Sequence, residues 1–266
     1  MENQIFIVLI AFTMEVVDSG LGMGFGTVLS PLLIILGYPS TVVVPSILFS
    51  QAIGGFIASV FHNKNQNADL IPTVVLNVHD LKKHIHLSRD LKISLLVGVL
   101  GAGATVTGAM LGIKISKELM KLYIGIIVTV VGIMLFMKVR YNFSWKKITA
   151  LAIISAFNKG FSGGGFGPLM TGGQVLSGNH AKRSIGSTTL SEVPICIVGF
   201  LTYAFTKNIS SYNLLISLTI GAFLGGIIGP FLTKHMNTNI LQRVIASLIL
   251  SEGIWLLSQY IIHLSV

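Results

Sequence analysis

The stretch that decides the fold runs from Asn158 to Glu192 and reads NKGFSGGGFGPLMTGGQVLSGNHAKRSIGSTTLSE. Its glycine-rich centre lies between apolar segments, and each glycine inside a helix costs about 1 kcal/mol relative to alanine. We therefore expect unwound backbone from Gly163 to Gly167. Pro168 suits the first position of a new helix, because proline lacks the N–H that would have no intrahelical partner there. The sequence predicts a loop leading into a helix N-terminus, where free N–H groups and the helix dipole favour an anion.

The composition is typical of a membrane protein. Apolar residues make up 52% of the 266 residues, and charged residues 10%. Several apolar runs approach the roughly 20 residues that a helix needs to cross a bilayer. These runs are Ser94–Ile113, Leu122–Met137, Ile185–Phe205, Leu214–Leu232 and Ile240–Ile262. No long polar segment interrupts them, so residues 1–266 are expected to form one domain embedded in the lipid bilayer.

The net charge of +9 does not indicate nucleic-acid binding, because lysine and arginine cluster in short segments between the apolar runs. The single cysteine, Cys196, excludes an internal disulfide. No spacing of cysteine and histidine is typical of a zinc site, and neither a metal nor a cofactor is expected. The histidines fall in predicted loops or at span ends, where surface or packing roles account for them.

The chain contains an internal repeat. A shift of 141 residues (161 minus 20) places Gly20–Gly26 on Phe161–Gly167 and Gln51 on Glu192. We assign repeat 1 to residues 1–138 and repeat 2 to residues 145–266. Repeat 1 carries an additional loop, residues 62–92, which is expected in the cytoplasm.

Each repeat is predicted to be all-α, with a re-entrant helix hairpin followed by three full transmembrane helices. The hairpin arms are Ile5–Val17 and Thr27–Leu36 in repeat 1, and Ile148–Phe157 and Pro168–Ser177 in repeat 2. Ten or eleven residues at a rise of 1.5 Å reach about 15 Å, which is half of a hydrocarbon core of about 30 Å. We therefore expect a polytopic protein of about 8–10 helical segments with its glycine loops near the membrane midplane.

The basic residues predict the orientation of the repeats. If the repeats are inverted, thirteen lysines and arginines fall on the cytoplasmic side, and only Lys114, Lys117, Lys121 and Lys207 fall outside. Parallel repeats would divide them ten to seven, so the positive-inside rule favours inversion. Inverted hairpins enter from opposite faces, and their glycine loops can meet halfway. Gln51 and Glu192 are expected at that same depth, about 15 Å along the next helix.

The two glycine loops are candidates for an anion site built from backbone N–H groups, although each loop could instead be a tight turn at a helix contact. The candidate substrate-binding residues are Gly22, Gly24, Gly26, Gln51, Lys159, Ser162, Gly163, Gly164, Gly165, Gly167, Gln174, Ser187 and Thr188. The hydroxyl and amide side chains could equally cap a helix or bond to a neighbouring helix. Lys159 either contacts the anion or forms a structural pair with Asp18 or Glu15.

Glu192, Asp18 and Glu15 are the candidates for proton coupling, because a carboxylate inside a membrane is costly and is by default functional or paired. Glu192 is the sole carboxylate in its predicted span. A hydrogen-bonded structural role is the alternative for this residue.

Two enzymatic interpretations are weak, and we expect no enzyme. Gly160 to Gly163 match the G-x-S-G motif of rhomboid-type intramembrane serine proteases, which need a histidine base on another helix. No histidine is predicted at mid-span in a later helix. The glycines near Gly20 are not a dinucleotide fingerprint, because no strand precedes them.

The glycine segments resemble the duplicated signature of the TauE/SafE family of sulfite exporters and organosulfonate transporters. The resemblance rests on Gly20–Gly37 with Pro31 and on Gly160–Glu192, while Met23 departs from the usual glycine triplet. It implies a multi-pass transporter in the cytoplasmic membrane of a prokaryote, with sulfite, a sulfonate or thiosulfate as its small anionic substrate. We expect an exporter that works by alternating access; an anion channel built from inverted half-helix hairpins is the alternative. The coupling ion and the oligomeric state stay open.

Overall fold

The computed structural model describes residues 2–77, 82–115, 117–206 and 211–264. The described residues of the first half form α1 (Glu2–Leu21), α2 (Phe25–Ile35), α3 (Ser40–Lys64), α4 (Arg89–Gly112) and α5 (Lys117–Phe136). Those of the second half form α6 (Trp145–Ser162), α7 (Phe166–Leu176), α8 (Ala181–Thr206), α9 (Tyr212–His235) and α10 (Thr238–Leu264). The expectation of an all-α polytopic fold with about 8–10 helical segments is confirmed. Lys207, predicted outside, lies beyond the described residues.

Six of the described helices, namely α1, α3, α4, α8, α9 and α10, are long and apolar enough to cross a membrane. The first arm of each predicted hairpin is longer than expected. In repeat 2 the arm predicted as Ile148–Phe157 is the 18-residue helix α6. In repeat 1 the arm predicted as Ile5–Val17 is the 20-residue helix α1, and its 18-residue segment Gln4–Leu21, about 27 Å long, is itself a candidate span. The polar end of α1 stays helical because it packs against α9, where Gly20 lies beside Gly229.

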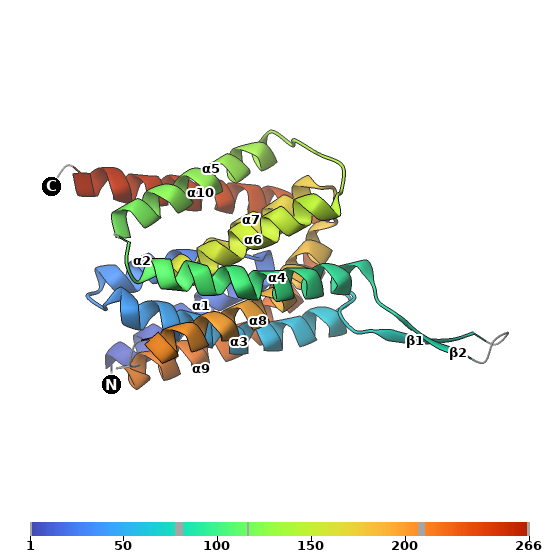
Figure 1. Cartoon of the computed structure of the whole chain (residues 1–266), viewed down its shortest axis with the longest axis horizontal. Coiled ribbons are helices and arrows are strands. Elements are labelled where there is room, and N and C mark those ends of the chain that lie inside the picture. Colours follow the sequence, from blue (N-terminus) through green and yellow to red (C-terminus); the bar gives the residue numbers. More distant parts are fainter. Residues whose placement is uncertain (1, 78–81, 116, 207–210, 265–266) are drawn as a thin grey trace.

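The helices pair across the two halves of the chain. α1 lies along α9 and α6 along α4, while α3 packs on α8 and α5 on α10 (Figure 1). Glycines allow the close approach: a Cβ at Gly225 of α9 would lie 2.7 Å from the carbonyl oxygen of Phe12. The glycines spaced at every fourth residue, which the sequence assigns to packing, line these contacts: Gly108 and Gly112 on α4, and Gly221, Gly225 and Gly229 on α9.

Two pairs of corresponding helices, α3 with α8 and α5 with α10, run in opposite directions. In the contact between α3 and α8, Leu48 lies beside Gly199 while His62 lies beside Gly186. The C-terminal part of α3 therefore packs against the N-terminal part of α8, so the two helices are antiparallel. α5 and α10 are also antiparallel, because Gly125 meets Leu257 and Gly132 meets Leu250.

The predicted loop at residues 62–92 is partly structured. α3 continues to Lys64, and two short strands, β1 (Thr73–Asn77) and β2 (Lys82–His86), form an antiparallel hairpin that pairs Thr73 with His86. Figure 1 shows this hairpin projecting beyond the helix ends. The Ser88 hydroxyl accepts a hydrogen bond from the Leu91 N–H at 3.0 Å and caps α4. The strands were not predicted, because five-residue runs between turns give only a weak signal.

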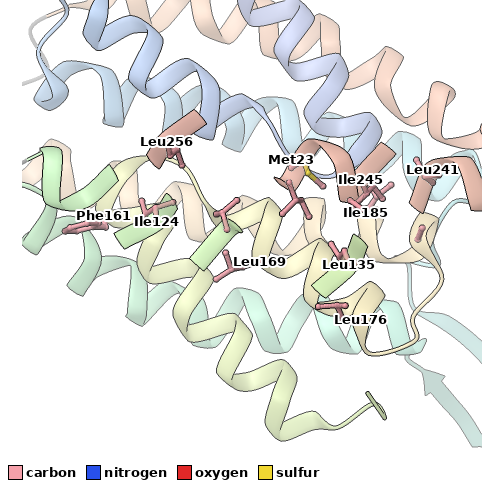
Figure 2. Packing of buried hydrophobic residues seen from close by; sticks show 14 residues of the cluster. Met23, Ile124, Leu135, Phe161, Leu169, Leu176, Ile185, Leu241, Ile245 and Leu256 are labelled. Atoms are coloured by element: carbon pink, nitrogen blue, oxygen red, sulfur yellow. The ribbon is translucent and has the colours of Figure 1, made fainter. Parts of the chain in front are cut away.

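One apolar cluster fills the space between the first glycine loop and helices α5, α7, α8 and α10 (Figure 2). Met23 contributes from the loop. The other helices contribute the buried side chains of Leu135, Leu169, Leu176, Ile185, Leu241, Ile245 and Ile249. Part of this cluster lies at the end of the molecule at which α7 ends and α8 and α10 begin, where Leu135 and Leu176 also border a cavity of about 520 Å³.

Candidate functional site

The two glycine loops are in direct contact. The Thr171 hydroxyl donates a hydrogen bond to the carbonyl oxygen of Gly22 at 3.1 Å, and the Gly165 N–H donates one to the Thr27 hydroxyl at 3.2 Å. A Cβ at Gly164 would lie 2.8 Å from the Cα of Thr27, so only glycine fits there. The loops meet, as the sequence predicts for hairpins that approach each other.

Each loop is built on two left-handed glycines. Gly22 (φ 81°) and Gly163 (φ 78°) end the first helix of each hairpin, while Gly24 (φ 127°) and Gly165 (φ 74°) precede the second. Residues with a Cβ rarely adopt these angles. The loops are shorter than predicted, since α7 begins at Phe166 and not at Pro168. Two glycines predicted in the loops instead lie in the first turns of α2 and α7: Gly26 and Gly167.

The N-terminus of α2 already holds a carboxylate. Asp18 Oδ1 accepts a hydrogen bond from the N–H of Phe25 at 3.0 Å. Its negative charge suits the positive end of the α2 dipole. Asp18 Oδ2 accepts a second hydrogen bond from Gln51 Nε2 at 3.2 Å. The first loop therefore supplies its own anion.

The N-terminus of α7 has no such group. The repeat places Lys159 where the first half has Asp18 (159 minus 141), and no side chain caps α7. Within the described residues, the N–H groups of Phe166 and Gly167 have no hydrogen-bond partner. These two donors are left without an acceptor in that part of the chain, and neither residue lines the cavity described below.

Asn158 lies behind the same helix end. Its side chain is fully buried against Gly165, where a Cβ would lie 3.4 Å from that of Asn158. Neither Oδ1 nor Nδ2 of Asn158 has a hydrogen-bond partner in the described part of the chain. A buried amide without partners costs about 1–3 kcal/mol, so Asn158 adds a second unsatisfied polar group at the start of α7.

A chain of side-chain contacts joins the two halves behind the loops. Lys159 Nζ lies 2.6 Å from Glu192 Oε1 and donates a hydrogen bond to Gln51 Oε1. Gln51 in turn donates to Asp18. Gln51 and Glu192 lie near the middles of α3 and α8, which have 25 and 26 residues. The predicted pairing of Lys159 with Asp18 or Glu15 is wrong, because α8 brings the closer carboxylate of Glu192 to the ammonium group.

Two further carboxylates lie in the interior. Glu15 on α1 is 1% exposed and Glu252 on α10 is 7% exposed. The Oε2 atom of each has no hydrogen-bond partner among the residues described. Glu252 faces the first loop, since a Cβ at Gly24 would lie 3.8 Å from its Oε1. The sequence analysis missed Glu252, although a single carboxylate within the apolar run Ile240–Ile262 was a usable signal.

A cavity of about 450 Å³ leads to the loops. Its mouth lies where α3 begins and α4 ends, near Ser40, Thr41 and Ile113. Its polar wall lies where the hairpins meet and consists of Thr27, Ser30, Ser162, Gly164 and Gly165. The remaining wall is mostly apolar and includes Pro31, Ile34, Val44, Ile124, Phe161 and Leu256. The second loop is therefore reachable from one end of the molecule.

Three predicted site residues lie elsewhere. Gln174 Nε2 donates to the Thr188 hydroxyl at 3.0 Å, and the Ser187 hydroxyl donates to Gln174 Oε1 at 2.9 Å. These residues do not line the cavity. α7 is helical from Phe166, which places Gln174 about 12 Å beyond its start. The three side chains connect α7 to α8.

The remaining polar groups fit structural roles. The Ser162 hydroxyl donates to the carbonyl of Asn158 and accepts from the N–H of Gly164, and no histidine bonds to it among the described residues. His62 is fully buried, with its Nε2 2.8 Å from the carbonyl oxygen of Ser19, which is a packing contact. Over the described chain, no group of three or more His, Cys, Asp or Glu residues could hold a metal ion.

These features define a multi-pass membrane protein with a buried polar site where two glycine loops meet. The chain belongs to the sulfite exporter TauE/SafE family, whose model matches residues 7–256. This is a family of membrane transporters for sulfur compounds, so the protein is a transporter and not an enzyme. No curated protein and no solved structure matches the chain.

Proposed function

We propose that the protein is a secondary transporter that exports a small sulfur oxyanion, such as sulfite, a sulfonate or thiosulfate, across the cytoplasmic membrane of a prokaryote. The observation that carries this proposal is the difference between the two helix N-termini. Asp18 caps α2, whereas the donors of Phe166 and Gly167 at α7 have no protein partner in the described residues. An oxyanion has several acceptor oxygens and suits the positive end of α7.

In this proposal the substrate binds at the second loop. Phe166 and Gly167 offer backbone N–H groups, and Asn158 offers its Nδ2 from behind the helix end. Gly164, Gly165 and Ser162 line the cavity, so an anion there would lie beside the backbone of the second loop. Lys159 supplies a fixed positive charge from its ion pair with Glu192. The first loop, with Gly22, Gly24 and Gly26, holds the second loop in place.

Alternating access is supported by two features of the helix arrangement. Two pairs of corresponding helices, α3 with α8 and α5 with α10, are antiparallel, as inverted repeats require. One cavity reaches the loops from one end, whereas the cavity of about 520 Å³ at the other end touches Leu176 but no residue of either loop. The apolar cluster around Leu176, Ile185 and Ile245 lies at that other end (Figure 2). If the two inverted repeats exchanged these two arrangements, the cavity that reaches the loops would open to the other side of the membrane. A carrier needs one closed end at a time, whereas an open channel needs a continuous path.

The orientation follows from the basic residues. Arg183 lies 3.9 Å from Asp90, which links the start of α8 to that of α4, and Lys182 donates to the carbonyl of Lys234 at the end of α9. These groups gather at the end of the molecule opposite the cavity mouth. With the positive end in the cytoplasm, the cavity faces outward.

The test is uptake into proteoliposomes that contain the purified protein. Wild type should give saturable counterflow of labelled sulfite or of an organosulfonate, and none of acetate. Asn158→Val, which copies Val17 of the first half, should lower the rate at least about tenfold. Gly103→Ala is the matched control, because no atom lies within 4 Å of a Cβ there. Absence of any sulfur oxyanion transport by wild type would refute the proposal, and single-channel currents would favour a channel.

A further inference from the structure

The site buries more carboxylates than it can neutralise. Glu15, Glu192 and Glu252 are at most 7% exposed, and Asp18 lies beside them partly buried. Lys159 is the single lysine or arginine buried among the described residues. An unpaired charge in the membrane interior is costly, so a carboxyl group without a counter-charge holds a proton or finds another cation. The carboxyl groups of this site therefore include at least one proton-binding group.

Glu192 and Asp18 are the least suited to carry that proton. Glu192 is 2.6 Å from the ammonium of Lys159, so protonating it would leave Lys159 without its partner. Asp18 accepts hydrogen bonds from Phe25 and Gln51, and both stabilise its ionised form. Each of the two remaining carboxyl groups, Glu15 and Glu252, has an Oε2 atom without a partner in the described structure.

We propose that Glu252 binds the proton that is coupled to transport, an inference that rests on the proposed function. Leu256, one helical turn further along α10, lines the cavity, which brings Glu252 within one turn of a route for protons. Its Oε1 faces Gly24 at the start of α2. Glu15 lies instead between Gly54 of α3 and Gly225 of α9. Neither glutamate lines the cavity itself, but α1, unlike α10, contributes no residue to the cavity wall.

The charge of Glu252 affects the packing of the first loop, because another carboxylate lies close to it. Among the described residues, Asp18 of α1 is the charged group that acts on Glu252, while Lys159 of α6 is already paired with Glu192 of α8. α7 contains no titratable residue, and α5 presents Thr129 beside Gly253, with its own charged residues in the first turns. An ionised Glu252 would place a second carboxylate beside Asp18 at the N-terminus of α2. A protonated Glu252 removes this repulsion and lets α10 stay packed on the first loop.

The coupling step moves one proton and makes or breaks no other covalent bond. A hydronium ion from the cavity transfers its proton to the Glu252 carboxylate and becomes water, and the neutral side chain allows the first loop to pack on α10. When the site opens to the other side of the membrane, Glu252 releases the proton to water there. The restored carboxylate of Glu252 then repels Asp18, which favours the return to the first conformation. The proton gradient across the membrane then drives the transport of the oxyanion.

The test separates coupling from binding in proteoliposomes. Glu252→Gln mimics the protonated group, so it should retain sulfite exchange at equal pH inside and outside. It should lose proton-driven accumulation at least about tenfold, together with the pH dependence of the exchange rate. Glu15→Gln tests the rival carboxyl group and should keep both, while loss of coupling in Glu15→Gln but not in Glu252→Gln would overturn the assignment; Gly103→Ala is the matched control. Glu252→Asp keeps a titratable group and should retain coupling with a displaced pH profile.

Accumulation by Glu252→Gln with the wild-type pH dependence would overturn the inference and leave the proposed transport intact. If Glu252→Gln does not fold, an unchanged pH profile in Glu252→Asp would overturn it instead. Failure of the wild type to transport any sulfur oxyanion would refute the proposed function, and with it the proton coupling.

Discussion

Lys159 and Glu192 form a 2.6 Å ion pair directly behind the contact between the two glycine loops. In the repeat, Lys159 matches Asp18 and Glu192 matches Gln51. The second half thus holds a charged pair where the first half holds a carboxylate and an amide. Gln51 joins the two halves by hydrogen bonds to Lys159 and Asp18. The two halves share a backbone plan, but their polar groups perform different tasks.

The ion pair predicts a stability effect that depends on both partners. Lys159→Met should destabilise the protein by about 3–5 kcal/mol, because it leaves the buried Glu192 carboxylate without a counter-charge. The double variant Lys159→Met with Glu192→Gln should recover most of that loss. Thermal unfolding of the purified protein in detergent measures both. A double variant as unstable as the single one would show that the charges are not coupled.

The contact between the loops predicts a steric requirement at Gly164. A Cβ there would lie 2.8 Å from the Cα of Thr27, and backbone cannot move aside as a side chain can. Gly164→Ala should therefore lower both the unfolding temperature and the rate of sulfite counterflow. Gly103→Ala in α4 should keep the rate and stabilise the protein by up to about 1 kcal/mol, since alanine favours the helix. Equal behaviour of the two variants would contradict the close contact.

The cap on α2 predicts graded effects at Asp18. Asp18→Ala removes the acceptor for the Phe25 N–H and should cost about 1–2 kcal/mol of stability. Asp18→Asn keeps an acceptor oxygen and should cost less. Thermal unfolding compares the two variants with wild type. If Asp18→Asn is as destabilised as Asp18→Ala, the negative charge matters more than the hydrogen bond.

The cavity predicts which positions react from outside the cell. Ser30→Cys lines the cavity and should react with a small membrane-impermeant thiol reagent added externally, and sulfite should slow the reaction. Leu176→Cys lies buried in the apolar cluster at the other end and should not react. The wild-type protein gives the background, because Cys196 is fully buried. Labelling of Ser30→Cys only from the cytoplasmic side would reverse the proposed orientation.

Much of the architecture can be predicted from local sequence patterns, namely the apolar runs and the positions of the glycines. Apolar runs near the length of a bilayer define the helices, and glycines at matching positions define the loops, because no other residue takes left-handed angles without cost. The family follows from the same segments. The glycine stripes on α4 and α9 are also legible in the sequence, since their spacing places them on one helix face.

The pairing of side chains required the tertiary structure. The length of α1 depends on its packing along α9, and the partner of Lys159 depends on how α6 meets α8. Glu252 enters the site from α10, more than two hundred residues after the loop that it faces. Sequence patterns report which residue can sit in a helix or a loop, because those preferences are local. Which carboxylate meets which cation is decided by helix packing over long separations, and only the folded chain defines it.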